Sequence, residues 1–457
     1  MLKQQLKEYP KEDVPTSEAP TPPEAPPPNK YNTPPYKRSR IAYNAEALLE
    51  YLISLTLVDA FLAVLGKSIG MSDALLGICG SLVSFAGLTQ VFTVFFSHRK
   101  PVKKRIFTVH LINNLMFAAL YILPFFSGVS KTVKIVLFFA LLLSGRLLLN
   151  MVASTKYVLA MSSVERHKYG VFSTTKEMIS LAAGMAFEYA IGWVSDYYRS
   201  IGQEKVCFLL FAITIVVITA LHAVSVSFLH EDKSKYEDMP VEDETLAKRV
   251  SDMLGLLKNK RFLQILAVFF LWRIADYISS PFMGTYAIDL AFTLTNVSIL
   301  AIIGSAIRFV LSRPVGKFAD KTSYCTMLIP IFGLVTVAFI FGAFAAPGSA
   351  WSFAVYRITR AAAYVGINSA TSNLMLDYVP REKSDYAIAL NSCIIGLAGF
   401  GSTLLGSALL SNIQKNGNTL FGIPVFAQQV LCAISAILTV VIILYLALFV
   451  RKLKRNV

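Results

Sequence analysis

Charge is scarce in this sequence. Asp, Glu, Lys and Arg make up only 16% of its 457 residues, whereas a soluble domain carries about 25%. Hydrophobic residues make up 55%, a share that would not keep several soluble domains of this total length in solution. A helix needs roughly 20 apolar residues to cross a bilayer. The composition therefore excludes a soluble protein and predicts one that crosses the lipid bilayer many times.

Motifs for catalysis, metals and cofactors are also lacking. The five cysteines lie far apart and at no metal-ligand spacing, so we interpret them as small core residues and expect no metal and no cofactor. The absence of a phosphate-binding loop excludes ATP as the direct energy source. No nucleophile has a base at a recognisable spacing, which argues against an enzyme. The polar start lacks the apolar core of a cleavable signal peptide.

The net charge of +15 could suggest a nucleic-acid ligand, but its placement argues against one. The cations lie in short loops between hydrophobic runs. The termini and the even-numbered loops carry 26 Lys and Arg residues, and the odd-numbered loops carry six. This asymmetry predicts that both termini are cytoplasmic. We expect a multi-pass protein of the plasma (inner) membrane, monomeric, with no nucleic-acid partner.

Twelve apolar segments follow a proline-rich start. Residues 1–40 predict a disordered cytoplasmic tail. We then expect a six-helix bundle at 41–229, a cytoplasmic linker with an amphipathic helix at 230–261, and a second six-helix bundle with a short basic tail at 262–457. The predicted fold class is an all-α membrane protein with twelve transmembrane helices in a 6+6 arrangement. The segments have the approximate limits 44–66, 73–96, 106–127, 132–160, 170–195, 206–229, 262–288, 293–314, 324–345, 350–377, 385–411 and 422–450.

The two halves carry matching residues. A shift of the sequence by 217 residues aligns Asp59 with Asp276. The same shift aligns three residues of the loop at 165–169 with the loop at 382–386, and a glycine of the fifth segment with one of the eleventh. Ungapped matches of this kind favour an internal repeat.

Six plus six helices, a long central loop and both ends inside resemble the major facilitator superfamily over about residues 40–455. The most specific match follows the eighth segment, where Gly316, Asp320 and Lys321 resemble the family's G-x-x-x-D-[R/K] loop. In that family the carboxylate and the cation latch cytoplasmic helix ends, so the resemblance implies a gating role. The matching loop at 97–104 has neither the glycine nor the aspartate. The resemblance also implies that helices 1, 4, 7 and 10 line a central cavity.

Six charged residues placed deep in the apolar segments all fall on those four helices: Asp59, Arg146, Arg273, Asp276, Arg357 and Arg360. A charge at the bilayer centre costs several kcal/mol, so it persists only beside a cavity or a partner. Guanidinium groups suit carboxylates, phosphates and sugar hydroxyls. We therefore predict a site for a polar or anionic solute. Its binding residues are Arg360, Arg357, Arg146, Asn150, Arg273 and Tyr364.

A purely structural interpretation of these charges stays open. Arg273 and Asp276 are three residues apart and could neutralise each other. Arg146 could pair with Asp59.

A coupling proton or sodium ion needs a buried carboxylate, and the candidates are Asp59, Asp276 and Glu188. Glu188 has no obvious local partner. Glu46 and Glu50 lie near the predicted cytoplasmic end of the first segment, and we expect them to reach water. No histidine has a clear mid-membrane position, so we expect proton coupling to use carboxylates.

The favoured function is that of a secondary active transporter, which moves a sugar or organic anion by alternating access together with an ion, as a symporter. One alternative is an efflux antiporter for drugs or other lipophilic compounds. The fifth segment reads Ala182-Ala183-Gly184-Met185 and lacks the Gly-Pro signature of many such antiporters. The other alternative is a non-transporting receptor or scaffold, whose function would survive neutralisation of Arg360 or Asp276.

Overall fold

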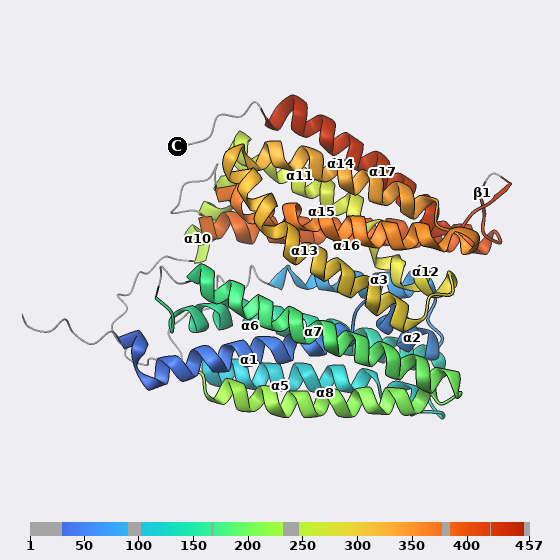
Figure 1. Ribbon diagram of the computed structural model, residues 1–457, viewed down its shortest axis with the longest axis horizontal. Coiled ribbons are helices and arrows are strands. Elements are labelled where there is room, and N and C mark those ends of the chain that lie inside the picture. The colour runs from blue at the N-terminus through green and yellow to red at the C-terminus, as the bar shows by residue number, and fades with distance from the viewer. Residues whose placement is uncertain are drawn as a thin grey trace, which may run out of the picture.

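The computed structural model describes residues 30–89, 102–165, 169–231, 246–376, 384–420 and 422–451. Its long helices form two groups, which Figure 1 shows one above the other with the N-terminal group below. Helix α10 (Leu246–Gly255) lies at one end of the molecule, which we call the linker end. The short strands β1 (Thr419–Leu420) and β2 (Ile423–Pro424) pair antiparallel at the opposite end, which we call the hairpin end.

The N-terminal bundle begins earlier than predicted. Its first helix starts at Pro34, a residue type whose fixed φ suits the first turn of a helix. The prediction of a disordered tail over residues 1–40 is therefore wrong for residues 34–40, and residues 1–29 lie outside the described ones. The helices of this bundle are α1 (Pro34–Thr56), α2 (Asp59–Ser68), α3 (Asp73–Ala86), α5 (Lys103–Leu120), α6 (Lys131–Met161), α7 (Tyr169–Ser200) and α8 (Glu204–Ser227).

The C-terminal bundle follows α10, which lies within the predicted linker. A hairpin that the sequence did not suggest precedes its last helix. Its helices are α11 (Lys260–Tyr277), α12 (Met283–Asp289), α13 (Leu294–Lys321), α14 (Tyr324–Ala343), α15 (Ala350–Leu376), α16 (Ser384–Lys415) and α17 (Ala427–Tyr445), which continues as a π-helical turn at Leu446–Val450.

The expected all-α membrane fold in two bundles is confirmed. In the described part of the chain, nine helices are long and apolar enough to cross a membrane, and the bent pair α1–α2 makes a tenth. Helices α3 and α15 occupy the two remaining predicted segments. Helix α15 is less apolar because it carries Arg357 and Arg360, and α3 is described only for its first 14 residues.

The predicted gating loop is part of a helix. Helix α13 continues through Pro314 as far as Lys321, so Gly316, Asp320 and Lys321 lie in its last turns and not in a loop. The connection to α14 is correspondingly short. Ser323 caps α14 by accepting a hydrogen bond from the backbone N–H of Thr326 at 3.0 Å.

Among the described helices, the largest contacts between the two bundles are those of α3 with α16, α7 with α13, and α2 with α12. Small residues permit the first contact, since a Cβ at Gly396 of α16 would lie 2.8 Å from the backbone oxygen of Ser84 in α3. Such close helix packing is typical of membrane bundles. The bundles therefore face each other around a central region, where α1, α2, α11, α12 and α15 come together.

Candidate functional site

Two helices break near the middle of the molecule, one in each bundle. Helices α1 and α2 meet at an angle of 50°. Asp59 opens α2 with a φ of 52°, in the left-handed region that Asp tolerates better than most residues. In the other bundle, a short 3₁₀ helix at Ser280–Phe282 separates α11 from α12. Asp276, the repeat partner of Asp59, lies in the last turn of α11 just before that break, so under the shift of 217 residues the two breaks fall about one turn apart. The sequence predicted an unbroken segment at both places.

The broken helices touch directly. A Cβ on Gly284 of α12 would lie 2.6 Å from the carbonyl carbon of Asp59. Only a glycine therefore lets the two breaks come this close without a rearrangement. Discontinuous helices at the interface of two repeats are where transporters place their substrate and ion sites.

Two arginines of α15 bind the two aspartates. Arg357 forms an ion pair with Asp59, which joins the C-terminal bundle to the N-terminal one. Arg360 lies 2.6 Å from Asp276 and donates a second hydrogen bond, at 2.9 Å, to the hydroxyl of Tyr364. Tyr364 in turn donates to Asp276. Neither pairing is the one considered from the sequence: Asp276 reaches across to α15 and not along its own helix, and Asp59 pairs with Arg357.

Arg146 of α6 has a different environment. It is 6% exposed, donates to the carbonyl of Leu57 at 3.3 Å, and lies 5.3 Å from the ring centre of Phe117. Among the described residues no carboxylate pairs with it. Its hydrogen bond satisfies a carbonyl left free at the α1–α2 break, while its positive charge stays uncompensated by a direct partner.

Three cavities adjoin these residues. The first, about 240 Å³, is lined by Asp59, Asp276, Arg146, Arg357 and Arg360, with Tyr277 and Tyr364 among their neighbours. The second, about 360 Å³, adds Glu188 and Arg308 to Asp59 and the two arginines of α15. The third, about 560 Å³, is lined by Arg146 and by polar residues of α1, α5, α6 and α7. The first two therefore each have one more positive than negative side chain.

Of the other predicted site residues, Asn150 and Arg273 lie apart from these cavities and Glu188 lines one of them. Asn150 donates to the backbone carbonyl of Arg146 at 2.9 Å and does not line them. Arg273 packs its side chain against Gly399 of α16 and lies 4.9 Å from the ring centre of Tyr277. Glu188 lines the second cavity and has no ion-pair partner in the part of the chain that the structure describes.

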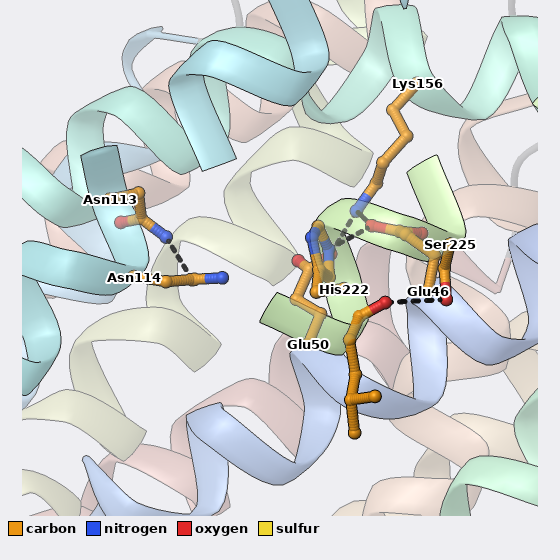
Figure 2. A network of polar contacts seen from close by, with 8 residues as sticks. Glu46, Glu50, Asn113, Asn114, Lys156, His222 and Ser225 are labelled. Carbon is orange, nitrogen blue, oxygen red and sulfur yellow. Dashed lines mark hydrogen bonds and ion pairs between the residues drawn. The ribbon is translucent and has the colours of Figure 1, made fainter. Parts of the chain in front are cut away.

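A second polar cluster lies inside the N-terminal bundle and was missed in the sequence. Glu46 is fully buried, although we expected it to reach water. One of its oxygens lies 2.8 Å from the ammonium of Lys156 and 2.9 Å from a ring nitrogen of His222. Lys156 also pairs with Glu50. Figure 2 shows the Lys156 side chain reaching these groups, with Asn113 and Asn114 to one side.

The reason for the missed cluster is the early start of α1. A helix that begins at Pro34 has Glu46 in its interior, about three turns from the helix start. The signal was present, because Tyr36, Ser39, Tyr43 and Glu46 recur at helical spacing and are all buried.

The hairpin end holds several polar contacts that join the bundles. Lys67 bridges Asp73 of its own bundle at 3.3 Å and Asp289 of the other at 3.1 Å. Gln414 donates to Asp73 at 2.9 Å. The carboxylate of Asp196 in α7 accepts the first free backbone N–H groups of α13, from Leu294 at 3.0 Å and Thr295 at 2.7 Å.

We expect Asp196→Ala to loosen this contact. The change leaves two N–H groups at the start of α13 without their acceptor and removes a negative charge that favours a helix N-terminus. The free energy of unfolding should fall by about 1 kcal/mol. An unfolding titration in detergent measures this change, and Asp196→Asn, which keeps one acceptor oxygen, should lose less. Equal stability of all three proteins would contradict the capping role.

These observations define a two-bundle membrane fold with a charged centre, of the kind that secondary transporters have. The family model described as Major Facilitator Superfamily matches residues 265–456. Among solved structures, the nucleoside transporter NupG is similar with a TM-score of 0.69 and 12% identity, over 90% of this chain and 99% of that one. The D-xylose–proton symporter has a TM-score of 0.64 at 12% identity, over 91% and 98%.

The xylose transporter XylE from E. coli, in a partially occluded inward-open conformation, has a TM-score of 0.58 at 13% identity, over 93% of this chain and 99% of that one. No curated protein sequence matches the chain. Residues 265–456 thus match the Major Facilitator Superfamily model, and the whole chain has the fold of these solved transporters. The resemblance seen in the sequence is confirmed.

Proposed function

We propose that this protein is a secondary active transporter for a small polar or anionic solute, such as an organic anion or a sugar, and that it works by alternating access in the plasma membrane with its termini in the cytoplasm. The observation that carries the solute class is Arg146. Its guanidinium is buried, borders two of the three cavities, and has no carboxylate partner among the described residues. A solute anion would supply the missing charge.

The paired charges around Arg146 support the same class of solute. Asp59 and Asp276 are already engaged by Arg357 and Arg360. The guanidinium groups of Arg357 and Arg360 and the hydroxyl of Tyr364 also line the first cavity. They offer hydrogen-bond donors there, which fit carboxylate or sugar oxygens. The cluster has one excess positive charge, which repels lipophilic cations and disfavours the efflux alternative.

The closed hairpin end supports alternating access. Lys67, Asp289 and Asp196 connect the bundles there, whereas the third cavity extends toward residues that lie nearer the linker end. A transport cycle requires these hairpin-end contacts to break while contacts at the linker end form.

A ligand screen on purified protein tests the proposal. We expect organic anions or sugars to raise the melting temperature, and Arg146→Gln to weaken that binding by about tenfold or more, because a hydrogen bond to a charged group is worth roughly 1.5–3 kcal/mol. This substitution leaves no carboxylate without its partner, because Arg146 pairs with none among the described residues. The matched control is Arg199→Gln, whose side chain is 47% exposed and pairs with Glu204.

Stabilisation that disappears in Arg146→Gln and persists in Arg199→Gln would support the arginine site. Stabilisation by lipophilic cations alone, equal in both variants, would contradict it and favour efflux.

A further inference from the structure

The buried cluster of the N-terminal bundle has contacts that the proposed solute site does not use. Its members come from four helices: Glu46 and Glu50 from α1, His110 from α5, Lys156 from α6 and His222 from α8. His110 and His222 stack with ring centres 4.8 Å apart. Glu46, His110 and His222 are at most 2% exposed, and Lys156 is 7% exposed. Groups of this kind inside a membrane protein mark ion or proton pathways more often than structural contacts.

The charges within the cluster do not balance. Two carboxylates face one ammonium, so with neutral imidazoles the cluster carries one excess negative charge. Hydrogen-bonding capacity is also unused, because one oxygen of Glu46 and both ring nitrogens of His110 are buried without a partner. A single proton, taken up by a carboxylate or by His222, would neutralise the cluster. Because these groups interact, the proton belongs to the cluster as a whole and not to one residue.

In the described part of the chain, other charged groups lie on the cavity side of the cluster. Arg146, Lys176, Glu177 and Arg308 line the third cavity together with Glu50, Lys156 and the hydroxyl of Tyr43. Glu46 and His222 do not line it. Glu50 is therefore the carboxylate through which the cluster meets the cavity, and Arg146 places a positive charge on that same cavity.

We propose that this cluster is a proton-binding site, which takes up one proton from the cavity through Glu50 when an anion binds at Arg146. An anion bound at Arg146 neutralises the positive charge that Arg146 presents to Glu50. The bound proton then supplies a positive charge in its place. Anion and proton then favour each other's binding, as linkage requires. The coupling rests on the proposed function, whereas the proton site does not.

A metal ion fits the same place less well. The ligand atoms of Glu46, Glu50, His110 and His222 lie within 4.8 Å of one another. The ammonium of Lys156, however, contacts both carboxylates and takes the position that a cation would need. A proton requires no such room.

Proton uptake can be measured on the full-length protein without any solute. We expect the wild type to take up about one proton more than Glu50→Gln or His222→Gln between about pH 8 and about pH 5, the range in which histidine and buried carboxylates titrate. Glu204→Gln is the matched control, since Glu204 is 44% exposed and lies outside the cluster. Glu50→Asp keeps the carboxylate and should retain the uptake, which separates loss of the proton site from misfolding.

Uptake by Glu50→Gln and His222→Gln equal to that of the wild type would overturn the proposal. So would a rise of the melting temperature with Zn²⁺ alone that is lost in His222→Gln, because the cluster would then be a metal site.

The coupling is tested with the anion that stabilises the protein most. Its addition in weak buffer should make the wild type take up a proton, and Glu50→Gln should bind the anion without uptake. Anion binding without uptake in the wild type overturns the coupling alone, whereas absence of any anion binding counts against the proposed function and leaves the titration result standing.

Discussion

Replacing Asp276 by alanine is expected to lower the free energy of unfolding by about 3 kcal/mol. The aspartate side chain is 1% exposed and accepts hydrogen bonds from Arg360 and Tyr364. Removal of one partner of a buried ion pair leaves the other charge without compensation, and such changes cost roughly 3–5 kcal/mol. We place the effect at the low end because Arg360 is 21% exposed and keeps access to the cavity. Unfolding in mixed detergent micelles measures the loss.

The matched control is Asp289→Ala. Asp289 also pairs with a cation, but its side chain is 26% exposed and that of Lys67 is 33% exposed, so the change should cost under about 1 kcal/mol. The double variant Asp276→Ala with Arg360→Ala should recover part of the loss, because it removes the stranded charge. A double variant as unstable as the sum of the two single ones would show that the pair is not energetically coupled.

The sequence was sufficient to place the charged centre on four helices. Asp59, Arg146, Asp276, Arg357 and Arg360 do gather around one cavity, as the cost of a charge in lipid requires. The pairings could not be read in the same way. They depend on how the helices of the two bundles are rotated toward each other, which the spacing of residues along one helix does not determine.

Two misplacements have a common cause in the helix ends. The first apolar segment starts at residue 44, and Glu46 was therefore expected at a water-exposed helix end. Helix α1 in fact starts ten residues earlier, with polar and basic residues. At the other extreme, the eighth segment was expected to end at residue 314, and the family resemblance implied a loop at Gly316 and Asp320, but α13 continues past Pro314. Apolar patterns report the lipid-spanning part of a helix, and membrane helices extend beyond it.

A disulfide between the bundles at the hairpin end is expected to stop transport. In α7, a Cβ at Gly192 would lie 2.7 Å from the hydroxyl oxygen of Ser298 in the first turns of α13. A cysteine at each position therefore has the reach for a disulfide. If the hairpin end must open in every cycle, the oxidised Gly192→Cys, Ser298→Cys variant should fall to background uptake of the anion found in the ligand screen, measured in proteoliposomes.

Reduction of the bond should restore most of that uptake, which separates the covalent link from the effect of the substitutions. The single variants Gly192→Cys and Ser298→Cys control for crowding, since the new Cβ at residue 192 is too close to its neighbours unless they shift by a few tenths of an ångström. The anion should still stabilise the oxidised protein, because neither Gly192 nor Ser298 lines the two cavities that Arg146 borders. Undiminished uptake in a fully oxidised sample would mean that α7 and α13 stay together throughout the cycle, and that the bundles do not separate at this end.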